Sequence, residues 1–384
     1  GNRWNIYTPR QVGIAMTQMD MSVCTIIHEN YVAHAKALFQ SLETTNPKME
    51  RFVLVLADID RVSGEFPNEV VLFPSDLGID PLYHQMCARY SHLELSTAVK
   101  PFLLAELLRR GYTGAIYLDP DILVLREMTR VEELLGAQSI VLTPHCLTPM
   151  PRDGLSPSER DIMRAGIFNL GFIAVSIEAE LFLEWWGERL SDGAFVDPDN
   201  GLFTDQRWID WVPSLFDFTV LKDWGYNVAY WNFHERQITR GPESSCRHCT
   251  VAEKRTAGGD TCVHSLLSNG EPLVFFHFSG FNPLRVDKTS KHFGDNLRTD
   301  VSDNSILLWL YQEYANALLT NGWKNWSRQP LPPSPSEIRL NPQPGLLKTT
   351  AAVLRLVKRF LLAVTREGFS VAWQRARSRI GKAL

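Results

Sequence analysis

Two carboxylates stand two residues apart in Asp119-Pro120-Asp121, directly after the apolar run 114–118. On a turn that leaves a strand, this spacing lets both side chains hold a hard cation without surrounding it. Hard cations such as magnesium and manganese take oxygen ligands and keep positions open for substrate phosphates. The alternative is a capped turn, because aspartate is common in turns. The chemistry indicated is binding of a divalent cation beside a phosphorylated substrate.

A histidine, His277, lies near the end of the apolar run 273–278 and is followed by Ser279 and Gly280. Such a run brings an imidazole to a strand terminus, the same kind of place as the two aspartates. A histidine combined with two carboxylates suits manganese better than magnesium. The alternative is a core histidine packed among phenylalanines.

The elements that must position these residues alternate between strands and helices. Strands are predicted from short apolar runs and helices from the spacing of apolar positions. The predicted strands are 21–27, 51–57, 69–73, 114–118, 140–143, 168–175 and 273–278, and the predicted helices are 31–42, 98–110 and 178–189. This alternation predicts an α/β fold with a mostly parallel sheet flanked by helices, which binds ligands at the carboxyl ends of its strands. Asp119 follows such an end.

The chain of 384 residues exceeds the usual size of one domain, and 45% hydrophobic with 21% charged residues is typical of a folded protein. We predict a catalytic domain over 1–326 that contains a polar insertion at 243–269. A proline-rich linker follows over 327–344, and a basic amphipathic helical tail over 345–384.

Positive charge is concentrated in the predicted tail. It carries nine Lys or Arg residues and one acid, Glu367, so its formal charge is +8 and that of the remainder is −12. An acidic body does not attract nucleic acid, whereas a basic amphipathic tail can bind an anionic membrane surface. A packed terminal helix or an oligomer contact explains the same pattern. Without a spanning run of about 18 apolar residues or a disulfide framework, we expect a cytoplasmic protein, peripheral on the inner face of the membrane if the tail binds lipid.

Further motifs follow the first strand in an order that a known family shares. They are His28-Glu29-Asn30-Tyr31, Lys100, Asp119-Pro120-Asp121, Phe168-Asn169-Leu170-Gly171, Asp205-Gln206 and His277-Phe278-Ser279-Gly280. Together they resemble glycosyltransferases of the GT-A fold, and most closely family 8, which includes glycogenin and bacterial lipopolysaccharide galactosyltransferases. The resemblance covers residues 22–283.

The resemblance implies a role for each motif. The nucleotide is contacted by residues 28–31, the donor by Lys100 and Asn169, the anomeric carbon is approached by Asp205 and Gln206, and the metal is held by Asp119, Asp121 and His277. It also implies retention of anomeric configuration. A cation at the diphosphate stabilises the leaving group, so Mn²⁺ or Mg²⁺ is the expected cofactor. We expect a UDP-sugar donor and a glycan or lipid-linked acceptor, in surface polysaccharide biosynthesis.

Two positions depart from the family pattern. A lysine usually follows the H-x-x-G motif and touches the diphosphate, but here Phe281-Asn282-Pro283 follows, and Arg285 or Lys288 would have to substitute. His28-Glu29 also stands where the family has aspartates, which leaves the identity of the nucleotide open.

Residues 224–236 combine aromatic and polar side chains, a mixture that can stack on sugar rings and bond their hydroxyls. His234, Glu235 and Arg236 are therefore candidates for acceptor contact. The alternative is a packed aromatic core, because amphipathic aromatic residues also pack well.

The predicted insertion contains residues of the types that bind structural zinc. The spacing is imperfect for zinc, and unpaired loop cysteines are the alternative. The candidate ligands are Cys246, Cys249, Cys262 and His264.

Two other classes of protein compete with the glycosyltransferase hypothesis. A sugar nucleotidyltransferase shares the fold type and the metal requirement, but it usually carries a glycine-rich basic loop after the first strand, which residues 28–38 lack. A catalytically inactive carbohydrate-binding relative would not need the D-x-D, D-Q and H-x-x-G motifs, which are all intact here.

Overall fold

The computed structural model describes residues 19–56, 59–241, 262–299, 301, 304–329 and 331. The predicted tail at 345–384 and most of the predicted linker lie outside the described residues, as do Cys246 and Cys249. Within the described part of the chain, none of the helices has the length and the hydropathy that a membrane span requires.

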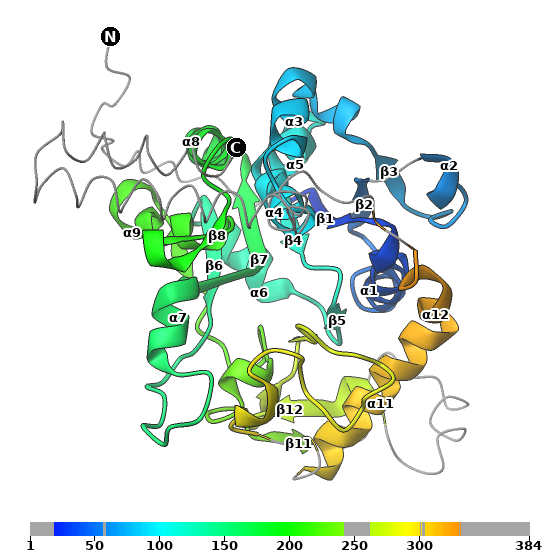
Figure 1. Cartoon of the computed structure of the whole chain (residues 1–384), viewed down its shortest axis with the longest axis vertical. Helices are drawn as coiled ribbons and strands as arrows, with labels where there is room; N and C mark the ends of the chain where they lie inside the picture. The colour runs from blue at the N-terminus through cyan, green and yellow to red at the C-terminus, as the bar shows by residue number, and fades with distance from the viewer. Residues whose placement is uncertain are drawn as a thin grey trace, which may run out of the picture. The chain divides into compact units, whose positions relative to one another are not determined.

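The central element is a seven-stranded sheet. Its strands are β1 Met21–Ile27, β2 Glu50–Val55, β3 Val70–Leu72, β4 Gly114–Leu118, β6 Ile140–Pro144, β7 Phe168–Ser176 and β10 Thr219–Val220. Their order is β10-β6-β7-β4-β1-β2-β3 (Figure 1). β7 pairs antiparallel with β4 and β6, and the other neighbouring pairs are parallel. The predicted α/β class with a mostly parallel sheet is confirmed.

The described helices differ in length, and some of them cover this sheet. They are α1 Val32–Thr45, α2 Ile59–Val62, α3 Asp80–Cys87, α4 His92–Ala98, α5 Lys100–Arg109, α6 Thr129–Leu135, α7 Glu159–Ala165, α8 Glu180–Leu190, α9 Val212–Leu215, α11 Ser305–Thr320 and α12 Trp323–Trp326. The helix predicted at 98–110 corresponds to α5, which starts at Lys100. Pro101 has no N–H to continue the hydrogen bonding of α4, and it stands in the first turn of α5, where that group is not needed.

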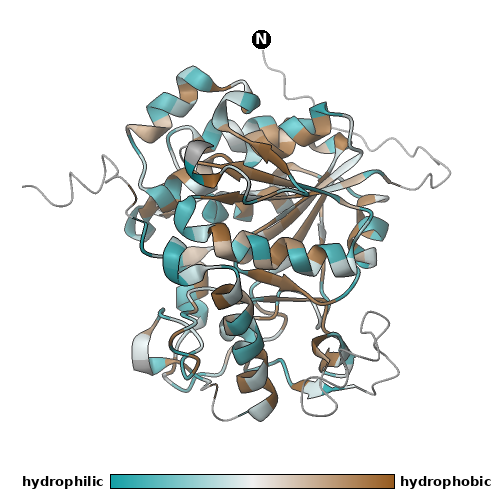
Figure 2. Cartoon of the chain, turned by 90° about the vertical axis from the view of Figure 1, so that its right-hand side faces the viewer, coloured by the Kyte–Doolittle hydropathy of each residue, from teal (hydrophilic) through white to brown (hydrophobic). Residues whose placement is uncertain are grey.

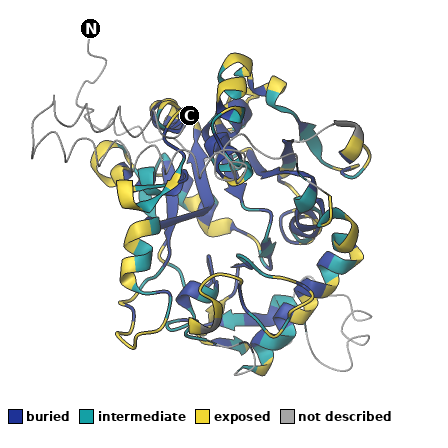
Figure 3. Ribbon diagram, in the orientation of Figure 1, coloured by how far each residue is buried: buried dark blue, intermediate teal, exposed yellow. Residues whose placement is uncertain are grey.

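The sheet is buried on both faces, as Figure 3 shows in dark blue. β1 is buried along its whole length, and its successive side chains point to opposite faces. Cys24 and Ile26 pack into one core with α5 and α8, whereas Val23 and Ile27 pack into a second core with α1 and α6. Figure 2 shows the hydrophobic strands between helices whose outer faces are hydrophilic. This two-sided burial explains the continuous apolar runs of the strands.

Shorter strands form three smaller sheets. They are β5 Ile122–Val124 with β14 Phe275–His277, β8 Val196–Asp197 with β9 Leu202–Phe203, and the three-stranded sheet of β11 Ile238–Arg240, β12 Leu266–Ser268 and β13 Glu271–Pro272. The strand predicted at 273–278 therefore pairs with β5 and not with the central sheet. β12 also lies inside the predicted insertion 243–269, most of which is outside the described residues.

Helix α11 and strand β14 form a third core. Phe278 stacks on Tyr314 with ring centroids 3.9 Å apart, and Phe276 packs edge-on against Tyr311 at 5.7 Å. Leu307, Leu310 and other buried residues of α11 complete this cluster. The aromatic contacts hold β14 in place, and His277 lies between the two phenylalanines in the chain.

Candidate metal and active site

The pairing of β14 with β5 brings distant parts of the chain to the same place. Asp119 leaves β4 and Asp121 precedes β5, and the N–H of Ile122 donates to the carbonyl of Asp119 at 3.1 Å to close the turn. His277 is paired in register with Ile122, and the N–H of Phe278 donates to the carbonyl of Asp121 at 2.9 Å. This register sets the imidazole beside the two carboxylates.

The three predicted metal ligands lie together. His277 Nε2 is 3.0 Å from Asp121 Oδ1 and 3.7 Å from Asp119 Oδ2. One ligand atom from each residue lies within 4.8 Å of the others, an arrangement that can hold a metal ion. The side chains of Asp119 and Asp121 are 29% and 16% exposed, whereas that of His277 is 3% exposed. The cluster is therefore closed on the imidazole side and more open on the carboxylate side.

In this cluster, burial and the opposite charge of the neighbouring side chain act against each other at His277 and at Asp121. Burial opposes the charged form of His277, but the carboxylates of Asp121 and Asp119 together outweigh burial and raise the pKa of the imidazole. Burial likewise opposes the charged form of Asp121, and the imidazolium outweighs it and lowers the pKa of this carboxyl group. A bound cation would take the place of the proton on Nε2, so metal binding would release a proton.

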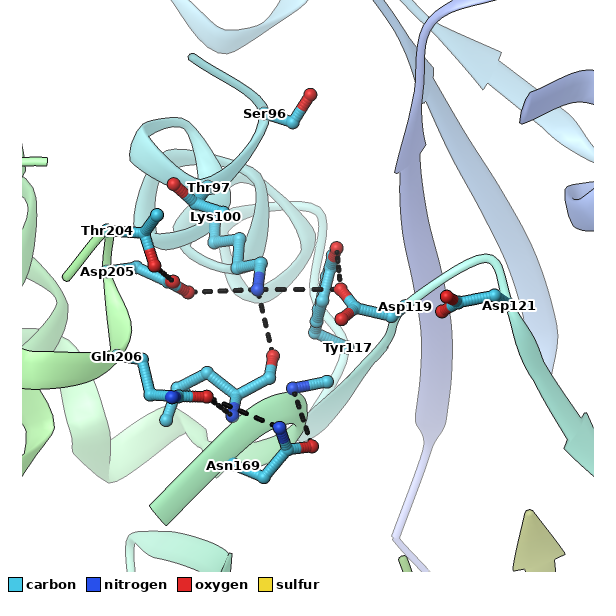
Figure 4. A network of polar contacts seen from close by, with 12 residues as sticks. Ser96, Thr97, Lys100, Tyr117, Asp119, Asp121, Asn169, Thr204, Asp205 and Gln206 are labelled. Atoms are coloured by element: carbon cyan, nitrogen blue, oxygen red, sulfur yellow. Dashed lines mark hydrogen bonds and ion pairs between the residues drawn. The ribbon is translucent and has the colours of Figure 1, made fainter. Parts of the chain in front are cut away.

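Lys100 connects the cluster to Asp205. Its Nζ lies 2.9 Å from Asp205 Oδ2 and 3.6 Å from Asp119 Oδ1, and it donates a hydrogen bond of 2.8 Å to the carbonyl of Leu170. Figure 4 shows the ammonium at the centre of these three oxygens. The ammonium also lies over the ring of Tyr117, 4.4 Å from its centroid. Lys100 is therefore fully engaged by protein groups, which favours a positioning role over the predicted direct contact with the donor.

Burial and charge act against each other at Lys100 and Asp205. Burial disfavours the ammonium of Lys100, but the carboxylates of Asp119 and Asp205 raise the pKa of this group above its usual value. At Asp205 burial is the stronger effect and raises the pKa of the carboxyl group, although Lys100 opposes the shift. The hydroxyl of Thr204 also donates to Asp205 Oδ1 at 3.0 Å.

Asp119 has a second donor besides Lys100. The hydroxyl of Tyr117, two residues earlier on β4, donates to Asp119 Oδ1 at 2.8 Å. The tyrosine hydroxyl and the ammonium therefore both face Oδ1, and Oδ2 faces His277. Because each oxygen has its own partners, the carboxylate is held with Oδ2 toward the cluster.

Asn169 and Gln206 lie on the other side of His277. Asn169 Oδ1 is 3.3 Å from His277 Nδ1, and Asn169 Nδ2 donates to Gln206 Oε1 at 3.3 Å. Gln206 also accepts a hydrogen bond from the N–H of Leu170 at 3.0 Å and donates to the carbonyl of Ala165 at 3.0 Å. Both polar atoms of the Gln206 amide therefore have hydrogen-bond partners in the protein, and one of these partners, Leu170, lies near the start of β7.

The motif after β1 lies near the cluster. Burial lowers the pKa of His28 to about 4, so its imidazole is neutral at pH 7, and Nε2 lies 3.3 Å from the carbonyl of His92. Glu29 forms an ion pair with Arg61 at 3.2 Å. Burial raises the pKa of Tyr31, and the charges of Asp121 and Asp119 raise it further. The side-chain oxygen of Asn30 is buried and has no hydrogen-bond partner among the described residues, so it has an acceptor to offer a ligand.

Two of the residues proposed for acceptor contact in the segment 224–236, Glu235 and Arg236, bind other groups of the protein. The carboxylate of Glu235 accepts hydrogen bonds from the N–H groups of Leu147 and Thr148, at 2.8 and 2.5 Å. Arg236 lies over the ring of Trp224, 5.0 Å from its centroid, and donates to the carbonyl of Asp223. Both side chains are buried, which favours the packed core for these two residues.

The candidates on the diphosphate side and in the zinc set either have other partners or lie outside the described residues. Arg285 pairs with Asp287 at 2.9 Å on the surface. Cys262 is disulfide-bonded, so its sulfur is not free to bind zinc, and His264 Nδ1 donates to the carbonyl of Leu125 at 2.7 Å. In the described chain Cys24, Cys87 and Cys146 are free thiols.

His145 and Gly171 belong to the site although neither was predicted as a functional residue. His145 directly follows β6, at the carboxyl end of a sheet strand, where ligands of such sheets bind. Its Nε2 lies 3.4 Å from Asn169 Nδ2. A Cβ at Gly171 would lie 2.6 Å from His277 Nδ1, so only glycine lets the imidazole approach β7 so closely. The sequence feature that could have identified His145 is its position directly after a predicted strand.

Comparisons with known proteins give the following similarities. No family model matches the chain. The chain is 24% identical over 307 residues to YfnF, an uncharacterized protein of Bacillus subtilis (strain 168), a match of 77% of this chain and 91% of YfnF. It is similar to the galactosyltransferase LgtC solved with donor and acceptor sugar analogs, with 14% identity, a TM-score of 0.41 and coverage of 83% of this chain and 99% of LgtC.

A second solved structure is the bifunctional glycosyltransferase WbbM, with 14% identity and a TM-score of 0.42. The match covers 81% of this chain and 51% of WbbM, so the chain spans about half the length of that protein. LgtC and WbbM are both glycosyltransferases by name.

Proposed function

We propose that this protein is a metal-dependent glycosyltransferase that moves a sugar from a nucleotide-diphosphate donor to an acceptor. The observation that carries the proposal is the convergence of Asp119, Asp121 and His277 on one another at the end of β4. Lys100 links this cluster to Asp205, the residue expected near the anomeric carbon. A cation-binding cluster beside a buried carboxylate suits transfer from a nucleotide sugar, because a cation can stabilise the charge on the leaving diphosphate.

The residues of the cluster fit Mn²⁺ or Mg²⁺. Two carboxylate oxygens and one imidazole nitrogen are a donor set that manganese accepts well, and magnesium prefers the oxygens. Three protein ligands leave other coordination positions for phosphate oxygens. When bound, the cation supplies Lewis acidity and neutralises the charge that develops on the leaving diphosphate.

The residues of the chain itself provide orientation. Lys100 and Tyr117 hold Oδ1 of Asp119, which leaves Oδ2 for the cation. We propose that Asp205 positions the donor sugar or the acceptor, and that the family resemblance extends to retention of anomeric configuration. Asn30 would accept a hydrogen bond from the nucleotide, because its buried oxygen has no partner in the described part of the chain.

For the substrates we propose a UDP-sugar donor and a glycan or lipid-linked acceptor, in the assembly of a surface polysaccharide. A neutral imidazole at His28, beside the ion pair of Glu29 with Arg61, would lie at the nucleotide. Pocket shape and hydrogen bonding set the choice of sugar. A panel of nucleotide sugars therefore tests this part of the proposal separately from the metal requirement.

The test is hydrolysis of nucleotide sugars by the purified chain without an acceptor, with Mn²⁺ or with a chelator. We expect release of the sugar from at least one UDP-sugar, dependent on Mn²⁺, and loss of this activity in Asp121→Ala with the fold intact. Asp199→Ala is the matched control, because the side chain of Asp199 is 89% exposed and pairs only with a surface arginine in the described chain. Cation-independent hydrolysis, or full activity of Asp121→Ala, would refute the proposal.

A further inference from the structure

The side of His277 that faces away from the carboxylates is occupied by a buried group of polar side chains. We call Gln206, Asn169 and His145 the amide relay, because two amides and an imidazole are joined in it by hydrogen bonds. All three side chains are buried. Nothing in the proposed chemistry assigns a function to His145 or to the bonds of this relay.

The direction of each hydrogen bond in the amide relay follows from the backbone. A backbone N–H can only donate and a carbonyl can only accept. The N–H of Leu170 points at one end of the Gln206 amide, at 3.0 Å, so that end is the oxygen. The carbonyl of Ala165 faces the other end, at 3.0 Å, so that end is the NH₂ group. The orientation of Gln206 is therefore fixed from both sides.

The orientation of the Gln206 amide determines the orientation of the Asn169 amide. The oxygen of Gln206 must receive a proton, so the NH₂ group of Asn169 points toward it, at 3.3 Å. The N–H of Gly171 donates to the other end of the Asn169 amide at 3.3 Å, which independently identifies that end as the oxygen. The same oxygen lies 3.3 Å from Nδ1 of His277, so Nδ1 carries the hydrogen in this contact.

His145 supports the same arrangement from a third direction. Its Nδ1 donates to the carbonyl of Ile167 at 3.1 Å, which leaves Nε2 as an acceptor for the NH₂ group of Asn169 at 3.4 Å. Burial lowers the pKa of His145 to about 4, so the imidazole is neutral and Nε2 keeps its lone pair. Trp231 packs edge-on against both His145 and His277, with centroids 5.3 and 5.1 Å away.

We propose that the amide relay positions His277 by accepting its Nδ1–H, which turns Nε2 toward Asp119 and Asp121 as the nitrogen that binds the cation. Histidines that bind metals commonly donate the other ring N–H to a fixed acceptor, and loss of that acceptor weakens binding. Gln206 is on this view a positioning residue for the metal site. The inference rests on the proposed function, because binding of a cation by His277 is part of it.

The test measures Mn²⁺ binding to the full chain by electron paramagnetic resonance, with ¹⁵N-labelled histidine to detect a nitrogen ligand through its coupling to the metal. Asn169→Leu removes the acceptor for Nδ1–H. We expect its Kd for Mn²⁺ to rise about 10- to 100-fold and the nitrogen coupling to be lost. Asn169→Asp keeps an acceptor for Nδ1–H but loses the NH₂ group that donates to Gln206 and His145, so its Kd should lie about tenfold below that of Asn169→Leu and its nitrogen coupling should be kept.

The matched control is Asn46→Leu. Asn46 is also buried, and its amide also bonds two backbone groups, those of Arg126 and Met128, but it lies outside the amide relay. This variant should lose stability and keep its Kd for Mn²⁺ and its nitrogen coupling. If Asn169→Leu is folded and binds Mn²⁺ as the original protein does, the inference is wrong and the proposed function stands. If Asn169→Leu does not fold, loss of the nitrogen coupling in Asn169→Asp, which keeps the acceptor for Nδ1–H, contradicts the inference. If the original protein binds no divalent cation, both fail.

Discussion

Lys100 and Asp205 form an ion pair of 2.9 Å in which the two side chains are only 3% and 2% exposed. Removing one partner of such a pair leaves an uncompensated charge in a place that water does not reach. The carboxylate of Asp119 lies 3.6 Å from the same ammonium, so Lys100 stands between the two acidic side chains. Lys100 therefore keeps two acidic groups of the site close together.

Replacement of Lys100 by Met should destabilise the protein by about 3 to 5 kcal/mol, because the carboxylate of Asp205 loses its counter-charge. The free energy of unfolding in urea measures this effect. Lys36→Met is the control, since the Lys36–Glu65 pair is 29% and 30% exposed and such pairs contribute about 0 to 1 kcal/mol. Equal losses in the two variants would show that the Lys100 pair is not buried in solution.

Gly171→Ala should impair metal binding more than it impairs folding. The added Cβ would lie 2.6 Å from Nδ1 of His277 and 2.9 Å from Oδ1 of Asn169, so the imidazole must move away from β7. We expect a loss of at least about tenfold in Mn²⁺ affinity, comparable to the loss of a group that orients a metal-bound histidine. Titration with Mn²⁺ measures the effect.

The control for this variant is Gly187→Ala in α8, where the nearest contact of the added Cβ is the ring of Phe102 at 3.0 Å. This ring can shift, and Gly187 lies on a helix that carries none of the cluster residues, so the Mn²⁺ affinity should not change. A similar loss of affinity in both variants would indicate a general packing effect.

The chain should lose stability as the pH falls below about 6.5, in part because of buried histidines. Burial lowers the pKa of His34 to about 4, from 6.5 in the unfolded chain. Between these values the unfolded state binds a proton that the folded state does not, so the free energy of unfolding decreases by roughly 1.4 kcal/mol per pH unit for this group. Above pH 6.5 both states are neutral at this position and the effect is absent.

His34→Gln should remove this contribution. Unfolding in urea at pH 7.5, 6 and 5 should show a shallower dependence on pH for the variant, by roughly one proton between pH 6 and 5. The difference between the two proteins isolates His34 from the other titrating groups. Identical pH dependences would contradict a neutral, buried imidazole at this position.

The central sheet was largely predictable from the sequence. β1 runs from Met21 to Ile27, as predicted, because every side chain in it is buried and the polar residues at its ends interrupt the apolar run. The strands that hold the site were harder to place. β14 pairs with β5 outside the central sheet, and this pairing joins residues that lie far apart in the chain, which periodicity does not reveal.

The residues of the candidate site were identified by their motifs, but the position of each side chain depends on packing. The motif predicts that Lys100 contacts the donor, and this stays a prediction; the enclosure of its ammonium by Asp205, Asp119 and the carbonyl of Leu170 was not predicted. A helix pattern does not show which polar residue is buried when a partner from another element neutralises it. His145 was missed because a single histidine after a strand resembles a core residue until its partners are known.

The most direct test is a crystal structure with Mn²⁺ and a nucleoside diphosphate, with anomalous scattering recorded at the manganese edge. We expect one anomalous peak about 2.0 to 2.4 Å from Nε2 of His277 and from carboxylate oxygens of Asp119 and Asp121, with phosphate oxygens at the remaining positions. A diphosphate bound elsewhere, or a manganese peak that contacts none of these three residues, would contradict the proposed function.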